Sequence, residues 1–173
     1  MGAPVSERPS FAIVPIAALR AHESTEPAKV RALAEALRRS GVFEEPIWVA
    51  AGSNVILNGH HRAAALARLG ADRVPAWRID YGSDAVALDR WSPGPPVSKA
   101  EVLRRAFSGE LFPPRTTRHM LAFALPAHGT PLVELGVRVG VGRRAPQRGA
   151  VPAARSGEYG SASSPRAKRS SVR

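Results

Sequence analysis

The sequence has no cysteine among its 173 residues. Disulfide scaffolds, cysteine-ligated zinc and thiol nucleophiles are therefore excluded. Long apolar runs are missing too, since none approaches the about 20 residues that a membrane-spanning helix needs. The first ten residues carry charges of both signs and lack the apolar core of a signal peptide. These absences favour a cytoplasmic protein, and the length of the chain predicts one domain with a core of its own.

Acidic residues are scarce at one end of the chain. Residues 136–173 hold nine Lys and Arg residues against one acidic residue, Glu158, whereas residues 1–135 hold 16 against 13. Most of the net charge of +11 therefore lies in the Gly-, Ala-, Arg-, Ser- and Pro-rich end, which we expect to be a disordered basic tail. The folded part is nearly balanced, unlike a domain built to follow nucleic-acid phosphates, although the tail could add weak nonspecific affinity for nucleic acid.

Helix and strand patterns follow one another through residues 11–135. A helix is expected from Pro27 to Gly41, because Val30, Leu33, Ala34 and Leu37 repeat at helical spacing. Strands are expected over 11–14, 46–50, 54–57, 74–81 and 85–91, and further helices over 63–69 and after a capping box formed by Ser98 and Glu101. We therefore predict a flexible arm over 1–10 and a domain over 11–135, divided into a core (11–91), a linker (92–97) and a helix with a polar loop (98–125).

The turn Asn58-Gly59-His60-His61-Arg62 joins a predicted strand to a predicted helix. A helix that begins near His60 directs unpaired backbone N–H groups and the positive end of its dipole at whatever lies above the turn. Gly59 permits a close approach of the backbone, Arg62 offers a forked cation, and the imidazoles can donate hydrogen bonds to an oxyanion. These features predict an anion site, with phosphate as its natural ligand. A purely structural alternative is that the glycine makes a tight turn and the His pair caps the helix.

The adjacent histidines also raise the question of a metal. Neighbouring residues diverge on a helix, and no other histidine or carboxylate stands nearby at a ligand-like spacing. A His-ligated zinc site is therefore not expected.

Three further features could carry chemistry. Glu23 precedes the first helix, where a carboxylate can act as a general base toward a hydroxyl, although acidic residues there also favour a helix N-terminus. Residues 113–119 gather two hydroxyls, two guanidinium groups and an imidazole, which suits polyphosphate or a carboxylate-bearing substrate but is equally an ordinary basic loop. Trp91 stands at a strand end, where it could stack on a base or pack as a lid.

Several of these motifs together resemble the ParB/sulfiredoxin superfamily. The turn string Val-Ile-Leu-Asn-Gly-His-His-Arg (55–62) is followed by an Ala-rich helix and by Leu-Gly-Ala-Asp-Arg-Val-Pro (69–75). The segments 19–23, 79–81 and 111–119 match in the same order. Within the superfamily the sequence is most similar to the free serine kinases, which carry an Asp-Gly-His-His-Arg box.

The resemblance covers about residues 14–134 and implies an α+β fold, with a small mixed sheet flanked by helices. It implies ATP or ADP as phosphoryl donor, Mg²⁺, and transfer to the hydroxyl of free L-serine or a similar amino acid. Glu23 resembles the acidic residue proposed to deprotonate that hydroxyl. The nucleotide-binding residues that the resemblance implies are Asn58, Gly59, His60, His61, Arg62, Trp91, Thr116, Thr117, Arg118 and His119.

One position departs from the family pattern. The family box begins with Asp, whereas this chain has Asn58, and the loss of a carboxylate weakens a site for a hard cation. A different acceptor, a slower reaction, or nucleotide binding alone would each fit that change.

Two other functions of the superfamily stand beside the kinase hypothesis. A ParB-like nucleotide-dependent DNA-binding or regulatory module is the alternative, although no helix-turn-helix pattern follows the core and the basic excess lies in the tail. A sulfiredoxin-type reductase is excluded, because its chemistry needs a cysteine where this chain has His60.

Overall fold

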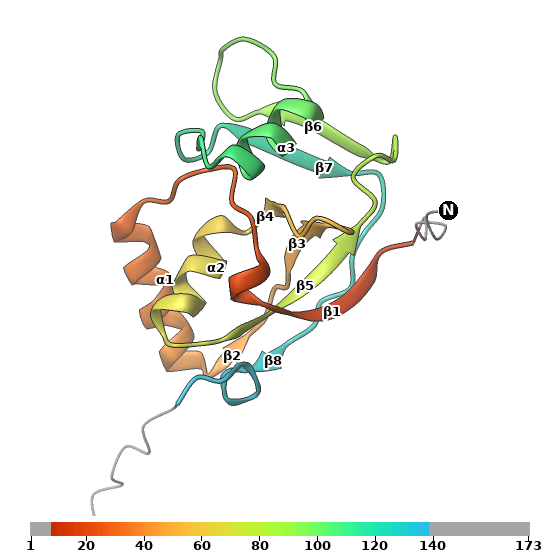
Figure 1. Ribbon diagram of the computed structural model, residues 1–173. Helices are drawn as coiled ribbons and strands as arrows, with labels where there is room; N and C mark the ends of the chain where they lie inside the picture. The colour runs from red at the N-terminus through yellow and green to blue at the C-terminus, as the bar shows by residue number, and fades with distance from the viewer. Residues whose placement is uncertain (1–7, 139–173) are drawn as a thin grey trace, which may run out of the picture. The chain divides into compact units, whose positions relative to one another are not determined.

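The computed structural model describes residues 8–138. Four strands form a mixed sheet in the order β1-β5-β3-β4, and two further strand pairs are β2-β8 and β6-β7 (Figure 1). The strands are β1 (Ser10–Pro15), β2 (Val42–Phe43), β3 (Ile47–Ala50), β4 (Ile56–Asn58), β5 (Arg73–Ile79), β6 (Val86–Arg90), β7 (Thr117–Leu121) and β8 (Thr130–Pro131). The helices are α1 (Pro27–Ser40), α2 (His60–Arg68) and α3 (Lys99–Ser108), with 3-10 turns η1 (Ile16–Ala18) and η2 (Leu132–Leu135). The expected α+β class is confirmed.

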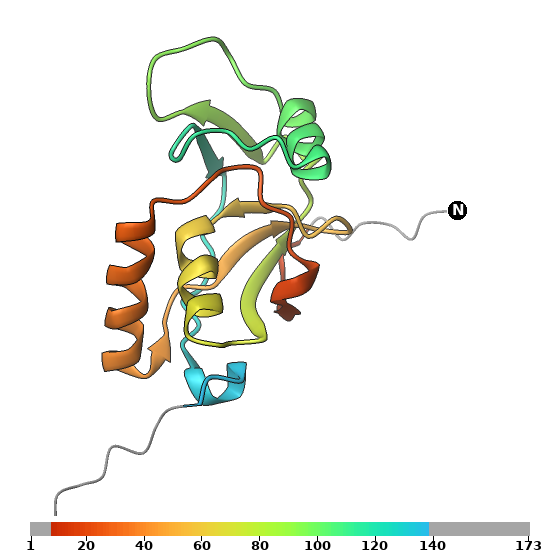
Figure 2. The same cartoon turned by 60° about the vertical axis from the view of Figure 1, so that its left-hand side comes forward.

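The predicted turn follows β4, which is an edge strand of the sheet. β3 and β4 form an antiparallel hairpin, α2 follows β4 directly, and the chain returns in β5, which pairs with β3 in parallel. Figure 2 shows α1 and α2 side by side on one face of the sheet. The N-terminal end of α2 therefore lies at the same end of the sheet as the last residue of β4, Asn58.

Strand alternation gives each face of the sheet its own core. On β3, Ile47 and Val49 join the cluster beneath α1 and α2, whereas Trp48 and Ala50 join the cluster on the opposite face. This is the period-2 pattern of a sheet covered on both sides. Burial of a large aliphatic side chain such as Ile47, which is fully buried, contributes roughly 1.5–3 kcal/mol.

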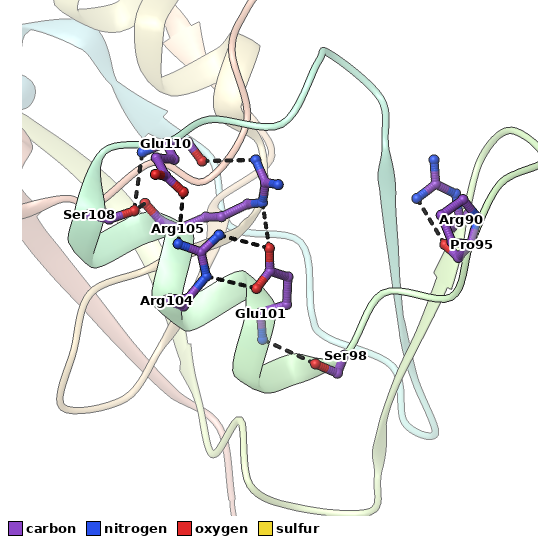
Figure 3. Close-up of polar contacts among 8 residues, drawn as sticks. All are labelled: Arg90, Pro95, Ser98, Glu101, Arg104, Arg105, Ser108 and Glu110. Carbon is purple, nitrogen blue, oxygen red and sulfur yellow. Dashed lines mark hydrogen bonds and ion pairs between the residues drawn. The ribbon is translucent and has the colours of Figure 1, made fainter.

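The helix boundaries follow the signals in the sequence. Pro27 stands in the first turn of α1, and Gly41 ends that helix in the left-handed conformation at φ 73°. The Ser98 hydroxyl accepts a hydrogen bond from the Glu101 N–H at 3.1 Å, so one half of the expected capping box forms at α3. Figure 3 shows why the other half does not form in α3: the Glu101 carboxylate is bound by Arg104 and Arg105.

The structure differs from the sequence-based prediction at 117–121 and at 137, and the short pair β2-β8 is a further difference because no strand was expected there. Residues 117–121 form strand β7, paired with β6, although a polar loop was expected there. Val137 lies inside the predicted tail, yet it is buried in the core together with Leu132 and Leu135. The rest of the predicted tail, from residue 139, and residues 1–7 of the predicted arm lie outside the described residues. Between residues 8 and 138, no helix has the length and apolar character needed to cross a bilayer.

Candidate active site

A cavity of about 350 Å³ gathers residues from four separate segments of the chain. Ten of the eleven site residues predicted from the sequence line it, together with Lys29, Leu33, Leu57 and Arg115. The exception is Thr116, whose side chain is buried and donates a hydrogen bond to the Pro113 carbonyl at 2.8 Å. The structure therefore brings together the turn at 58–62, the residue before the first helix and the predicted polar loop.

The floor of the cavity is the N-terminal end of α2. Gly59 has φ 103°, and a Cβ atom there would stand 2.6 Å from Ile47 Cγ2. The fold itself therefore requires glycine at this position, independently of any ligand. No side chain caps the helix, so its first-turn N–H groups and the positive end of its dipole are left for an anion.

The two histidines of the turn bind backbone groups through Nε2. His61 Nε2 accepts from the Glu26 N–H at 3.1 Å, and His60 Nε2 accepts from the His22 N–H at 3.5 Å. The pKa of His60 is well below its ordinary value because the ring is buried, and the pKa of His61 is lowered for the same reason. Both rings therefore connect α2 to the segment before α1 as neutral acceptors, and only their Nδ1–H groups remain as donors.

Arg62 is held by neighbouring residues at the edge of the cavity. Its guanidinium donates to the Glu45 carbonyl at 2.6 Å, contacts the Glu45 carboxylate at 3.2 Å, and reaches Asn58 Oδ1 at 3.4 Å. Three other cations of the cavity, Lys29, Arg115 and Arg118, make no ion pair with any residue of the 8–138 segment.

Glu23 is the only carboxylate among the lining residues. It is 7% exposed, and its segment bridges to Phe112 at the start of the polar loop. Oε1 accepts from the Thr117 N–H and the Thr117 hydroxyl, both at 2.5 Å, and Oε2 accepts from the Arg115 N–H at 3.0 Å. The polar loop that was expected to bind polyphosphate thus holds the carboxylate through two backbone N–H groups and the Thr117 hydroxyl.

Glu23 and His60 also line a second cavity, of about 470 Å³. Its other walls are mostly apolar and come from residues 16–25, Ile56, Leu111 and the Ala63, Ala64 and Ala67 face of α2. Glu23 therefore lies in the wall between a cationic cavity and a mostly apolar one.

The opposite rim is formed by β6 and β7. Trp91 is 55% exposed, and the guanidinium carbons of Arg118 and Arg115 lie 4.9 and 5.6 Å from the centre of its ring. His119 Nε2 is hydrogen-bonded to the Tyr81 hydroxyl at 2.8 Å, and burial lowers the pKa of His119 to about 3. His119 is thus a neutral wall residue, whereas Trp91 and the two guanidinium groups form a flat, cationic and accessible surface.

Lys29 and Arg115 are cavity residues that the sequence-based list omitted. Arg115 belongs to the predicted polar loop, and its position in that loop could have identified it as a site residue. Lys29 falls in the first turn of α1 after Pro27, and helical periodicity alone does not distinguish it from a solvent-facing lysine.

The residues present do not fit a protein-held Mg²⁺ ion. Mg²⁺ favours carboxylate oxygens, but Glu23 is the single carboxylate of the lining and accepts three hydrogen bonds, and Asn58 supplies only a neutral amide. No group of three or more His, Asp or Glu side chains within residues 8–138 could hold a metal ion. Four cationic side chains line the cavity instead.

Comparison with known proteins confirms the resemblance read from the motifs. The chain is 31% identical over 104 residues to an ADP-dependent L-serine kinase of Thermococcus kodakarensis, covering 58% of this chain and 43% of that protein. It is 35% identical over 85 residues to an ATP-dependent L-serine kinase of Staphylothermus marinus, covering 47% and 34%. A ParB-like protein of Sulfolobus acidocaldarius is 40% identical over 74 residues, covering 43% and 37%. The chain thus spans less than half the length of the curated relatives it matches, and no family model matches it.

Solved structures show the same fold. A free serine kinase in complex with AMP superimposes with a TM-score of 0.66 at 20% identity, covering 72% of this chain and 93% of that one. A C-terminally truncated SbnI from Staphylococcus aureus gives a TM-score of 0.60 at 15% identity, covering 72% and 88%. The expected fold is therefore confirmed.

Proposed function

We propose that the chain is a small-molecule kinase that transfers a phosphoryl group from ATP or ADP to the hydroxyl of free L-serine or a similar amino acid. The observation that carries the proposal is the position of Glu23, the single carboxylate in a cavity that has four cationic side chains and a helix N-terminus. An anion-binding surface with one base at its edge is what phosphoryl transfer to an alcohol needs. The sequence similarity to two L-serine kinases supports the same reaction.

Donor phosphates would bind between the end of α2 and the cations that have no ion pair in the described part of the chain. Lys29, Arg115 and Arg118 come from different elements and line one cavity, and the first turn of α2 adds uncapped N–H groups. The nucleotide base would stack on Trp91, whose ring is more than half exposed. Because phosphoryl transfer is catalysed mainly by positioning and charge neutralisation, this arrangement supplies most of what the reaction requires.

Glu23 would act as the general base. The acceptor hydroxyl gives its proton to the carboxylate while its oxygen forms a bond to the terminal phosphorus of the nucleotide. The bond from that phosphorus to the bridging oxygen breaks, and the leaving nucleotide keeps the electron pair. The cavity along Ala63, Ala64 and Ala67 gives the acceptor an approach to Glu23 that the phosphates do not occupy. A positioned base of this kind contributes about 10²- to 10⁴-fold to the rate.

With Glu23 assigned as the base, the cavity residues leave no further carboxylate for the Mg²⁺ that the resemblance implies. We infer that this chain neutralises phosphate charge through Lys29, Arg115 and Arg118, and that any divalent cation arrives with the nucleotide.

A ParB-like nucleotide-dependent DNA-binding or regulatory module is the second candidate, because a ParB-like protein is among the relatives. The two hypotheses predict different products. The test is to incubate the chain with ATP or ADP, Mg²⁺ and a panel of free amino acids, with and without duplex DNA, and to detect phosphorylated acceptors by mass spectrometry. We expect a phosphorylated hydroxy amino acid, whereas nucleotide turnover that responds to DNA without any phosphorylated acceptor would overturn the kinase proposal.

A further inference from the structure

A buried chain of hydrogen bonds runs from His22 to Glu23 through Thr117. His22 Nε2 lies 2.9 Å from Thr117 Oγ1, and that hydroxyl donates to Glu23 Oε1. The two carboxylate contacts of Thr117 join residues 94 positions apart in the sequence. His22 is fully buried, so this contact is built into the interior of the protein.

The direction of the chain follows from counting protons. A hydroxyl carries one proton, and Thr117 donates it to the carboxylate, so His22 Nε2 has to be the protonated ring nitrogen. His22 Nδ1 then carries a lone pair, and it has no hydrogen-bond partner within the described part of the chain. The Ile56 carbonyl beside this ring would instead favour a proton on Nδ1, so the bond from Thr117 to Glu23 is the observation that sets the Nε2–H tautomer.

The two carboxylate oxygens of Glu23 differ in the number of hydrogen bonds that they accept. Each carboxylate oxygen offers about two lone-pair positions. Oε1 accepts both bonds from Thr117, whereas Oε2 accepts one, from the Arg115 N–H. Oε2 is therefore the oxygen with a lone pair left for a proton from an acceptor.

We propose that His22 is a positioning residue for Glu23: through the Thr117 hydroxyl it saturates Oε1 and leaves Oε2 directed at the acceptor. The effect of His22 on catalysis rests on the proposed kinase function. The hydrogen-bond geometry of His22, Thr117 and Glu23 does not depend on it. His22 does not touch the substrate or receive a proton in this role.

The surroundings of His22 suit a fixed, neutral ring. It packs at right angles to His60, with ring centres 4.5 Å apart, and within 5.7 Å of His119. Burial lowers the pKa of His22 to about 4. A ring that stays neutral near pH 7 keeps one proton at one nitrogen, which is what orienting a hydroxyl requires.

The geometry is testable without any assay of activity. Histidine labelled with ¹⁵N distinguishes the two tautomers by the chemical shifts of the ring nitrogens. We expect His22 as the Nε2–H tautomer in the wild-type chain, with loss of that preference in Thr117→Val and its retention in Thr117→Ser. A wild-type Nδ1–H tautomer, which the neighbouring Ile56 carbonyl would favour, would overturn the proposal.

The catalytic consequence is tested by a matched pair of substitutions. In His22→Gln the side-chain amide nitrogen reaches about the position of Nε2, whereas in His22→Asn it does not. We expect His22→Asn to lower kcat by about 100-fold, as for a misplaced catalytic group, with the KM for nucleotide changed less than about threefold. His22→Gln should recover most of the lost rate, and His128→Asn, the same exchange at an exposed ring tilted against Phe11, should match the wild type.

The outcomes separate the two proposals. If His22→Gln and His22→Asn lose activity equally while both remain folded by circular dichroism, His22 acts on packing alone and the inference fails. If His22→Asn does not fold, the Thr117→Val and Thr117→Ser pair gives the same comparison of kcat with a hydroxyl removed or kept. If no wild-type activity is found but the tautomer is Nε2–H, the kinase proposal fails and the positioning geometry stands.

Discussion

The side chains of the cavity differ in how much hydrogen-bonding capacity they have left for a ligand. Arg62 already binds Glu45 and Asn58, and the Nε2 atoms of His60 and His61 accept backbone N–H groups. The cavity cations that have no ion pair among residues 8–138 come from α1 and the polar loop instead. The turn at 58–62 therefore contributes mainly the end of α2 and the shape of the cavity floor. The negative charge of the phosphates would be neutralised by Lys29, Arg115 and Arg118.

The first prediction at this scale concerns the base. Glu23→Gln removes the negative charge but keeps an oxygen that can accept from the Thr117 N–H. We expect kcat for acceptor phosphorylation to fall by about 10²- to 10⁴-fold, while the Kd for nucleotide, measured by calorimetry, changes less than about tenfold. Loss of nucleotide binding with chemistry retained would contradict the role given to Glu23, and Glu35→Gln on the exposed face of α1 is the matched control.

The second prediction concerns Asn58. Its amide oxygen accepts from Arg62 at 3.4 Å at the mouth of the cavity, where the family pattern has a carboxylate. We expect the wild-type chain to bind nucleotide in EDTA within about threefold of its affinity in Mg²⁺, whereas Asn58→Asp should bind more tightly with Mg²⁺ than without it, because the added carboxylate suits a hard cation. The same variant should phosphorylate free serine faster if the natural residue directs the site away from serine.

Calorimetry with and without Mg²⁺ checks both halves of this prediction. A wild-type chain that binds nucleotide only in the presence of Mg²⁺ would show that the cavity cations do not suffice. Asn54→Asp, in the turn between β3 and β4 and away from the cavity lining, is the matched control.

At the scale of elements, the site depends on a small layer made of α3, β6 and β7. Phe112 pairs with the Glu23 segment, and the Arg105 guanidinium of α3 lies 4.0 Å over its ring. The Glu101 carboxylate binds Arg105 in turn and also binds Arg104, which holds Glu110 (Figure 3). The start of α3 is therefore connected to the loop that holds Glu23.

Strand β7 shows what sequence patterns can and cannot reveal at this scale. Thr117 and His119 are buried while Arg118 and Met120 are exposed, which is the period-2 signal of a strand. The pair of prolines just before it and the polar composition favoured a loop instead. The chemistry of the segment could be predicted from its residue types, but its strand pairing with β6 depends on contacts that are remote in sequence.

The prediction at this scale tests the N-cap of α3. Ser98→Ala removes the hydroxyl that accepts from the Glu101 N–H, so the free energy of unfolding should fall by about 1 kcal/mol. Urea denaturation measures the change, and Ser98→Asp, which keeps an acceptor, is expected to restore stability. An unchanged unfolding free energy in Ser98→Ala would show that the ion pairs of Glu101 hold the helix start without the cap.

At the scale of the whole molecule, the candidate site is a meeting point of segments that the sequence keeps far apart. The residue types at 23, 58–62 and 116–119 were predictable, because anions, helix N-termini and carboxylate bases demand particular chemistry. The contacts among these residues could not be predicted. The hydrogen bonds between Glu23 and Thr117 and between Tyr81 and His119 form only once the strands have paired. The sequence likewise could not reveal that Val137 belongs to the core.

The cluster of buried histidines predicts how the stability of the whole protein depends on pH. Burial lowers the pKa of His22 to about 4 and that of His119 to about 3, and it holds the pKa of His60 well below its ordinary value of 6.5. Below about pH 6.5 the unfolded chain binds protons at these rings and the native protein does not, so stability is lost as the pH falls toward 4. For each ring that stays neutral in the native protein but is protonated in the unfolded chain, the unfolding free energy falls by up to about 2 kcal/mol from pH 7 to pH 5.

Urea denaturation of the wild type and of His22→Gln at pH 7 and pH 5 measures this dependence. His22→Gln removes one of the three buried rings whose pKa is lowered, so its stability should fall less steeply with decreasing pH. Equal slopes in the wild type and His22→Gln would mean that His22 takes up a proton as readily in the native protein as in the unfolded chain. A charged ring would donate from both nitrogens, so that result would also remove the single-proton geometry from which the role of His22 in orienting Glu23 is argued.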